Sequence, residues 1–330
     1  MEPIKHADAH AHGFTPHLLR ASTLFVHPAA GVAQPAAYAD DLATTCRAVS
    51  LVLPADTVFT HLTSARLRGW WLPMTNHDLP LIACSDSDAP HHDRRGVYVR
   101  RCGIPPGHRT HLGDVAVASA EWTIVELAEH LVLLDLVAII DSALHLEHTT
   151  TDRIRAAMRP GRRGVRVLRR ALDLADERSE SWWETMLRLL HELSGVPVEP
   201  QQVITNAAGV EVARVDLRIR GTNRVPEYDG SDHRPRERHE KDLRRDKVLA
   251  RQGLERYGYI ATEIIHDPEG IIRDAEDALG LPHVLGRTGL WRSEARLATI
   301  SRAGQAALER RLQRFVRTAS PRTRRASGAN

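Results

Sequence analysis

The chain has 330 residues, of which 42% are hydrophobic and 26% charged, with 45 lysines and arginines against 42 aspartates and glutamates. This composition excludes a largely disordered, collagen-like or coiled-coil protein. The net charge of +3 does not by itself indicate a nucleic-acid partner. Because a single hydrophobic core stops growing beyond about 250–300 residues, two domains are expected.

Residues 1–150 are predicted to form a smaller, mixed α+β N-terminal domain. Apolar spacing and β-branched content predict helices at 13–20 and 61–73, a helix that runs into an extended segment at 42–54, and strands at 31–32, 79–85 and 96–101. Ser119 is predicted to begin one long helix that ends near residue 146. Its most apolar part contains two aspartates and is too short to cross a bilayer, so no membrane segment is expected.

The three cysteines, Cys46, Cys84 and Cys102, are far apart, and the sequence contains no C-x-x-C pair. This spacing predicts neither a structural zinc site nor a disulfide framework. The N-terminus lacks the apolar segment that is typical of a signal peptide. A reducing, cytoplasmic location is therefore expected.

Two basic regions flank the C-terminal half. Residues 151–178 are predicted to form an arginine-rich helical linker, in which Arg163 and Arg166 either contact DNA phosphates or form a solvated face. Residues 281–330 are predicted to form a helix near 301–317 and a disordered tail, with eleven arginines against two acids from Arg287 onward. This region either binds nucleic acid or keeps the chain soluble.

Residues 179–280 are predicted to form an α/β domain with a mixed sheet. Helix 181–193 has Ser181 as its N-cap and Glu184 at the third helical position. The elements that follow are strands at 198–204, 210–219 and 224–230, a charged helix at 234–257, a strand at 259–265 and a helix at 267–279.

Acidic residues are predicted to meet at one edge of this sheet. Asp216 lies in one strand, and Glu227 and Asp229 are two residues apart in the next, so they share a face. Glu184 can approach from the preceding helix. Such a group is unstable without a cation, and Mg²⁺ accepts these oxygen ligands. The site could hydrolyse a phosphodiester, with His233 as general acid or base. The alternative is that these acids simply face solvent.

The same residues resemble the very-short-patch-repair-like endonuclease domain of the P-D-(D/E)-x-K restriction-endonuclease superfamily. The resemblance rests on SESWWETMLRLL (179–190), ARVDLRI (213–219), PEYDGSDH (226–233) and DLRRDKVLARQGLERYGY (242–259). It implies a restriction-endonuclease-like mixed sheet flanked by helices. It also implies a Mg²⁺ site in which Asp216 is the central ligand, assisted by Glu184 and Glu227. Arg244 and Arg245, on the charged helix, are expected to bind DNA.

The sequence departs from the superfamily pattern in two places. Asp229 stands at the position of the superfamily lysine, two residues after Glu227, and cannot supply that lysine's positive charge. Pro226 removes a backbone donor from its strand, which is therefore expected to be an edge strand or locally bent.

The N-terminal half resembles the AbiEi-type antitoxin and transcription-regulator proteins of actinobacteria. The likeness rests on HLTSARLRGWWLP (61–73), RRGVYVRR (94–101) and ASAEWTIVELA (118–128), although Trp122 and Glu126 replace an arginine and an aspartate of that family. The leading hypothesis is a Mg²⁺-dependent DNA endonuclease, for which a homodimer would suit double-strand cleavage. The alternatives are a DNA-binding regulator or antitoxin-like protein with a catalytically silent nuclease fold and a partner toxin, or an interaction module without nucleic acid.

Overall fold

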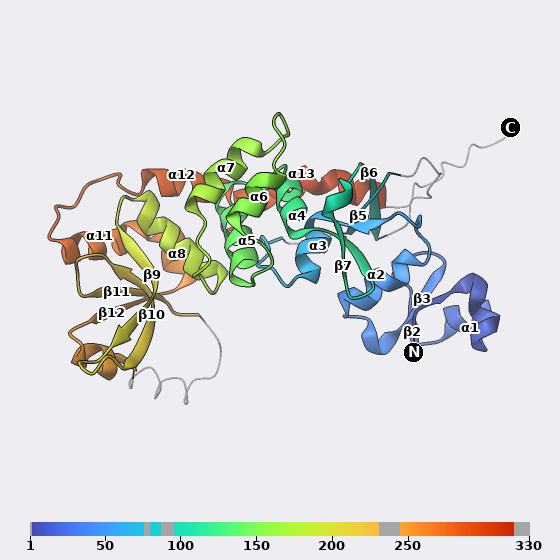
Figure 1. Ribbon diagram of the computed structural model, residues 1–330, viewed down its shortest axis with the longest axis horizontal. Coiled ribbons are helices and arrows are strands. Elements are labelled where there is room, and N and C mark those ends of the chain that lie inside the picture. Colours follow the sequence, from blue (N-terminus) through green and yellow to red (C-terminus); the bar gives the residue numbers. More distant parts are fainter. Residues whose placement is uncertain (1, 76–79, 87–95, 231–244, 320–330) are drawn as a thin grey trace. The chain divides into compact units, whose positions relative to one another are not determined.

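The computed structural model describes residues 2–75, 80–86, 96–230 and 245–319, although the side chains of 314–319 are excepted. The fold is α+β, with helices and mixed sheets (Figure 1). The chain divides into two compact units, each built from separate segments. Unit 1 comprises Met1–His130, Asp152–Val165 and Leu308–Asn330, and unit 2 comprises Leu131–Thr151 and Arg166–Ala307.

Unit 1 contains a five-stranded sheet in the order β6-β5-β4-β8-β7. Its strands are β4 (Val58–Phe59), β5 (Leu81–Ser85), β6 (Val97–Arg101), β7 (Arg109–Leu112) and β8 (Val115–Ala118). Strands β5 and β6 are parallel, as are β4 and β8, while β4 and β5 are antiparallel. Helix α2 (Leu42–Ser50) contributes Cys46 and Val49 to the same core as Phe59 and Val117.

A second, three-stranded sheet in unit 1 has the order β1-β3-β2. Its strands are β1 (Ile4–Lys5), β2 (Phe25–Val26) and β3 (Val32–Pro35). The short helices η1 (His6–His12) and α1 (Pro16–Ala21) lie between β1 and β2 in the sequence. The predicted helices at 13–20 and 61–73 correspond to α1 and α3 (His61–Leu67), although α3 ends six residues before the predicted end. The predicted strands at 79–85 and 96–101 correspond to β5 and β6, whereas the prediction at 31–32 meets only the first residue of β3. The chain turns after α2 instead of extending as predicted.

The prediction of one long helix from Ser119 is wrong. Ser119 does cap a helix, since its hydroxyl accepts the Trp122 N–H at 3.3 Å, but α4 (Ala120–Leu127) ends before α5 (Leu133–His145) begins. Both helices are buried on every side, so their apolar pattern carries no signal for the break. The break also falls where the two units divide: residues 131–150, which the sequence analysis places in the N-terminal domain, lie in unit 2.

In unit 2, the predicted helix and hairpin are confirmed. They are α8 (Trp182–Leu193), β9 (Val198–Thr205) and β10 (Glu211–Ile219), followed by β11 (Arg224–Tyr228). The predicted linker helices are α6 (Thr151–Ala157), most of which belongs to unit 1, and α7 (Val165–Leu174), most of which belongs to unit 2. Helix α11 (Pro268–Leu279) and helix α13 (Arg302–Ala319) also lie where the sequence predicts them, whereas α12 (Gly289–Leu297) was not predicted.

The strands of unit 2 form two ladders instead of one continuous mixed sheet: β9 pairs antiparallel with β10, and β11 pairs parallel with β12 (Glu255–Tyr259). The Asp229 N–H donates to the Tyr259 carbonyl of β12. Because backbone N–H groups point to alternate sides along a strand, the backbone nitrogens of residues 226 and 228 face β10 instead. Pro226 has no N–H, and the Tyr228 N–H donates to the Asp216 carboxylate at 3.0 Å. Proline and the aspartate side chain therefore interrupt backbone pairing between β10 and β11.

The boundaries predicted after residue 245 are wrong. The described part of the charged helix covers 245–251, and Gly253, at a φ of 70°, follows it in the left-handed conformation that ends helices. Residues 255–257, predicted as helix, are the start of β12, and the predicted strand 259–265 is mostly α10 (Ala261–His266). Pairing with β11 decides the strand, because the two tyrosines of ERYGY favour a strand whereas Glu255 and Gly258 disfavour one.

No helix within the described ranges has both the length and the apolar character needed to cross a membrane.

Candidate active site

Asp216 lies in β10 between the fully buried Val215 and Leu217. Strand alternation places these apolar side chains on one face and Asp216 on the other. Burial, followed by the negative charges of Glu184 and Glu227, raises the pKa of Asp216 to about 7, against the smaller opposing effects of the Tyr228 N–H and Arg245. Glu184 and Glu227, the two other acids that the sequence predicts as metal ligands, therefore lie close enough to Asp216 to act on its charge.

Glu184 is held in place at the start of α8. Its own N–H donates to the N-cap Ser181 hydroxyl at 3.2 Å, as the sequence predicts. Its carboxylate accepts the Glu180 N–H and the Gln201 amide, both at 2.9 Å. Gln201 has a φ of 49°, a left-handed conformation that is uncommon for residues other than glycine and that concentrates at functional sites.

Glu227 is 2% exposed, and two arginines neutralise it. One carboxylate oxygen accepts from Arg245 and the other from Arg256. Arg256 also binds Asp229 and lies 3.5 Å from Asp246. Arg245 is therefore turned toward Glu227, whereas Asp246 is exposed.

The donor chemistry around Asp216 is of the kind that a hard divalent cation prefers, since the charges of Glu184 and Glu227 act on this carboxylate. The fit is incomplete at Glu227, whose two oxygens are both engaged by arginine. Among the residues that the structure describes, the group whose ligand atoms all lie within 4.8 Å of one another is Cys84, Cys102 and Glu126, not the three predicted acids. Glu227 would have to exchange an arginine for the cation.

The other predicted site residues are placed as follows. Arg163 and Arg166 are exposed, whereas Arg245 is turned toward Glu227 and donates to the Arg214 carbonyl at 2.7 Å. His233 and Arg244 lie outside the described residues.

Sequence reasoning missed Arg256, because residue 256 was assigned to a helix. The sequence signal that could have found Arg256 is the nearby Gly258. A Cβ at this position would collide with the Asp229 carboxylate, so a glycine allows the backbone to approach the acids closely. The R-x-G arrangement of residues 256–258 places an arginine and this close approach in one strand.

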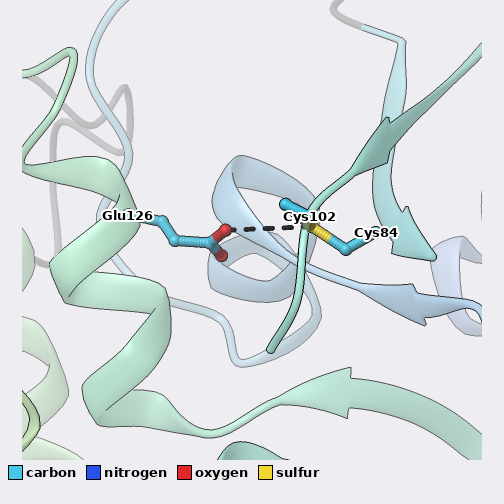
Figure 2. Close-up of side chains that lie close together, drawn as sticks. All are labelled: Cys84, Cys102 and Glu126. Atoms are coloured by element: carbon cyan, nitrogen blue, oxygen red, sulfur yellow. Dashed lines mark hydrogen bonds between the residues drawn. A yellow bond between two sulfur atoms is a disulfide. The ribbon is translucent and has the colours of Figure 1, made fainter. Parts of the chain in front are cut away.

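Unit 1 holds a disulfide between Cys84 and Cys102, which corrects the prediction that no disulfide forms (Figure 2). Cys84 pairs with Arg100 in the parallel β5–β6 ladder, and Cys102 follows two residues later, so the two Cα atoms are 5.8 Å apart. Strand pairing, which the spacing of cysteines in the sequence does not report, decides this contact.

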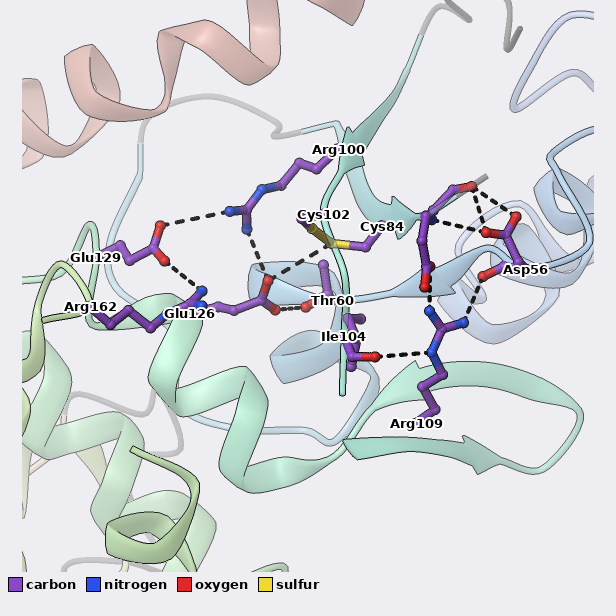
Figure 3. Close-up of a disulfide and its surroundings, with 12 residues drawn as sticks. Asp56, Thr60, Cys84, Arg100, Cys102, Ile104, Arg109, Glu126, Glu129 and Arg162 are labelled. Carbon is purple, nitrogen blue, oxygen red and sulfur yellow. Dashed lines mark hydrogen bonds and ion pairs between the residues drawn. A yellow bond between two sulfur atoms is a disulfide. The ribbon is translucent and has the colours of Figure 1, made fainter. Parts of the chain in front are cut away.

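Glu126 faces this disulfide from α4, in a network of buried polar groups (Figure 3). Its carboxylate accepts from Thr60 and from Arg100, the latter at 3.1 Å. Burial raises the pKa of Glu126 to about 7, although Arg100 and Arg162 oppose the shift. Arg162 also binds Glu129 at 2.6 Å.

Trp122 of α4 has a cation beside its ring. Arg162 lies over its ring, with the guanidinium carbon 4.8 Å from the ring centroid. This positive charge comes from the turn between α6 and α7.

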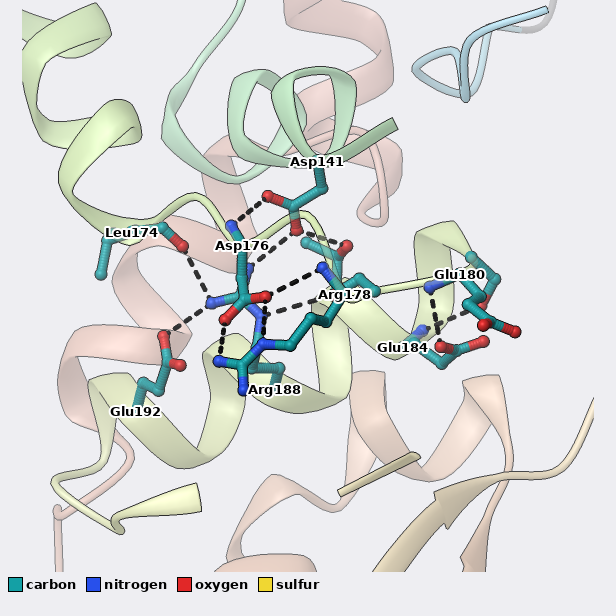
Figure 4. A network of polar contacts seen from close by, with 11 residues as sticks. Asp141, Leu174, Asp176, Arg178, Glu180, Glu184, Arg188 and Glu192 are labelled. Carbon is teal, nitrogen blue, oxygen red and sulfur yellow. Dashed lines mark hydrogen bonds and ion pairs between the residues drawn. The ribbon is translucent and has the colours of Figure 1, made fainter. Parts of the chain in front are cut away.

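A third polar network, in unit 2, lies around Asp141 of α5 (Figure 4). Asp141 and Arg188 form an ion pair at 2.8 Å whose side chains are 0% and 1% exposed. The Asp176 N–H and the Thr185 hydroxyl also donate to Asp141, both at 2.8 Å. These contacts join α5, α8 and the segment after α7 and indicate a structural role.

Comparison with known proteins gives little functional information. No family model matches the chain, and no solved structure matches it. The chain is similar to uncharacterized proteins of Mycobacterium tuberculosis strains CDC 1551 / Oshkosh and ATCC 25618 / H37Rv, each 34% identical over 140 residues. The match covers 42% of this chain and 48% of each relative, so the chain spans about half the length of these proteins.

Proposed function

We propose that residues 179–280 form a restriction-endonuclease-like domain that hydrolyses phosphodiester bonds in DNA, with a divalent cation, Mg²⁺, held at Asp216. The observation that carries this proposal is the partly buried Asp216 carboxylate near Glu184 and Glu227: burial, followed by the charges of these two acids, raises its pKa to about 7. A bound cation relieves this repulsion and keeps Asp216 ionised. Mg²⁺ at this position supplies activation of water and neutralisation of phosphate charge.

The surrounding residues would prepare the site for a negatively charged substrate. Gln201 fixes the Glu184 carboxylate through a hydrogen bond of 2.9 Å. Arg245 and Arg256 offer guanidinium groups beside the acids, and these groups can bind phosphate oxygens when DNA enters. Cleavage of both strands requires two such sites, so we expect a homodimer on DNA. A DNA-directed activity is consistent with a cytoplasmic location.

Plasmid nicking with Mg²⁺ or with a chelator tests this proposal. The parent protein should nick with Mg²⁺ alone, and Asp216→Asn should lower the rate by orders of magnitude, because cation binding and water activation both depend on this carboxylate. Glu211→Gln, at an exposed acid of the same strand, is the matched control and should cleave like the parent. Mg²⁺ should raise the Tm of the parent and of the control more than that of Asp216→Asn. Identical Mg²⁺ responses in all three proteins would contradict the proposal.

The second candidate is a DNA-binding regulator or antitoxin-like protein, with a partner toxin, whose nuclease fold is catalytically silent. The ion pairs of Arg245 and Arg256 favour it, because they neutralise Glu227 and Asp229 without a cation. This candidate predicts DNA binding without cleavage and no Mg²⁺ effect on Tm in any of the three proteins.

A further inference from the structure

Cys84, Cys102 and Glu126 converge in unit 1 from three different elements. Cys84 lies in β5, Cys102 just beyond β6 and Glu126 in α4, and Figure 2 shows the carboxylate directed toward the two sulfur atoms. The Cys84 sulfur and the Glu126 Oε1 atom are 3.9 Å apart. Tetrahedral zinc, with Zn–S bonds of about 2.3 Å and Zn–O bonds of about 2.1 Å, sets its ligand atoms about 3.5–3.8 Å apart. The carboxylate therefore already lies near ligand distance.

We propose that these three residues bind one Zn²⁺ ion when the Cys84–Cys102 disulfide is reduced, and that the disulfide excludes the ion. This site lies in unit 1, so it is independent of the function proposed for Asp216 in unit 2. Two thiolates and one carboxylate are a donor set that suits zinc better than magnesium or calcium, which prefer oxygen ligands alone.

The carboxylate is oriented before any metal arrives. Glu126 is 1% exposed, and its Oε2 atom accepts the Thr60 hydroxyl, while Oε1 faces the Cys84 sulfur. Hydrogen bonds of this kind hold a ligand in place and strengthen metal sites. Thr60 belongs to the segment between β4 and α3, so the sheet itself positions the ligand.

The charges balance in both states of the site. With the disulfide formed, the negative charge of Glu126 is offset by Arg100, at 3.1 Å. With the disulfide reduced, two thiolates and Glu126 carry three negative charges, and Zn²⁺ together with Arg100 supplies three positive charges. Because an uncompensated buried charge is costly, this balance favours either state over three bare anions.

The chemistry of the exchange is as follows. A dithiol reductant breaks the Cys84–Cys102 bond, leaves two protein thiols and becomes a disulfide itself. Zn²⁺ then replaces the two thiol protons, which are released to solvent. Cys84 is 1% exposed and Cys102 is half-buried, so reductant and metal approach from the side of Cys102. Three protein ligands leave the fourth zinc position for water or an external ligand.

Zinc titration of the full chain tests the proposal. The protein is reduced and freed of reductant, or kept oxidised, and titrated with Zn²⁺ against a chromophoric chelator. We expect the reduced chain to bind one more Zn²⁺ than the oxidised chain. Cys84→Ser and Cys102→Ser should each weaken this binding by more than about 100-fold, since losing even a partner of a metal ligand costs about 10- to 100-fold. Cys46→Ser, at the free buried cysteine, is the matched control and should bind like the parent.

A measurement on the parent protein alone guards against variants that fail to fold. Zn²⁺ should slow the reaction of the two reduced thiols with an aromatic disulfide reagent, and Co²⁺ should give a thiolate-to-metal absorption band. Equal zinc binding by the oxidised and reduced chains would overturn the proposal. Full thiol reactivity in the presence of Zn²⁺, or loss of binding in Cys46→Ser alone, would also overturn it.

Discussion

The ion pair of Asp141 and Arg188 is buried almost completely, with side chains 0% and 1% exposed. Burial is the largest cause that raises the pKa of Asp141 to about 6, and Arg188 opposes this effect. Burying two charges is costly, but removing one partner of such a pair is costlier still, because the other charge stays buried alone. The pair therefore limits which substitutions unit 2 tolerates.

Asp141→Asn keeps the shape of the side chain but removes the charge that Arg188 faces. We expect it to lower the free energy of unfolding by about 3–5 kcal/mol, measured by urea denaturation. Glu192→Gln removes a second, half-buried carboxylate 2.9 Å from the same arginine and should cost about 1 kcal/mol or less. Equal losses in the two variants would contradict the special role of Asp141.

Asp216 makes stability depend on pH. Its pKa is raised from 3.8 to about 7, so between these values the folded protein binds a proton more tightly than the unfolded chain. Stability from this group is present at low pH and is lost as pH rises from about 4 to about 7. The group thus opposes folding at neutral pH unless a cation is bound.

Asp216→Asn removes this cost and can still accept the Tyr228 N–H through its amide oxygen. In the presence of a chelator, we expect the variant to be more stable than the parent by about 1–3 kcal/mol at pH 8, and equally stable near pH 4. Urea unfolding at both pH values measures the difference. Glu211→Gln should show no such pH-dependent gain, and a gain at pH 4 as large as at pH 8 would contradict the argument.

At the scale of elements, the arginines of α7 differ in whether an acidic side chain already neutralises them. Its apolar residues Leu168 and Ala171 are fully buried, and Arg166 and Arg169 are exposed. Arg170 binds Glu294 at 2.9 Å. Exposed guanidinium groups release counterions from DNA when they bind phosphate, whereas an arginine that is already paired contributes less.

If α7 contacts DNA, Arg166→Gln and Arg169→Gln should each weaken duplex binding and reduce the slope of log K against log salt by about 1. Arg170→Gln should change the slope less, because Glu294 already neutralises that arginine. Fluorescence anisotropy over a salt series measures all three slopes. Unchanged slopes for Arg166→Gln and Arg169→Gln would indicate a solvated face, the other interpretation of this helix.

The wrongly predicted elements share one physical cause. The break between α4 and α5 is held by tertiary contacts: the Glu129 carboxylate binds Arg162, and the His130 ring lies 3.0 Å from His61. Likewise, β12 forms where local propensity is mixed, because β11 offers a parallel partner. Apolar periodicity records which residues are buried, but not which neighbour buries them.

At the scale of the whole molecule, each of the two units is assembled from segments that are distant in the chain. A division of the sequence into consecutive domains cannot reproduce this arrangement. Asp135 of α5 illustrates the reason, since it accepts the Thr299 N–H at 3.0 Å and the Thr299 hydroxyl at 2.7 Å across 164 positions of sequence. The aspartate that interrupts the apolar helix is a buried acceptor for a distant turn.

By itself, the sequence determined the local features of this protein: the α+β class, the Ser181 cap of α8, the β9–β10 hairpin and the placement of Asp216 on a strand beside Glu227. These follow from side-chain periodicity and capping, which act over a few residues. Only the tertiary structure decided that Arg256 faces Glu227 and Asp229, and that Cys84 meets Cys102 and Glu126. Ion pairs and metal ligands depend on distances through space, and strand pairing between distant segments sets those distances.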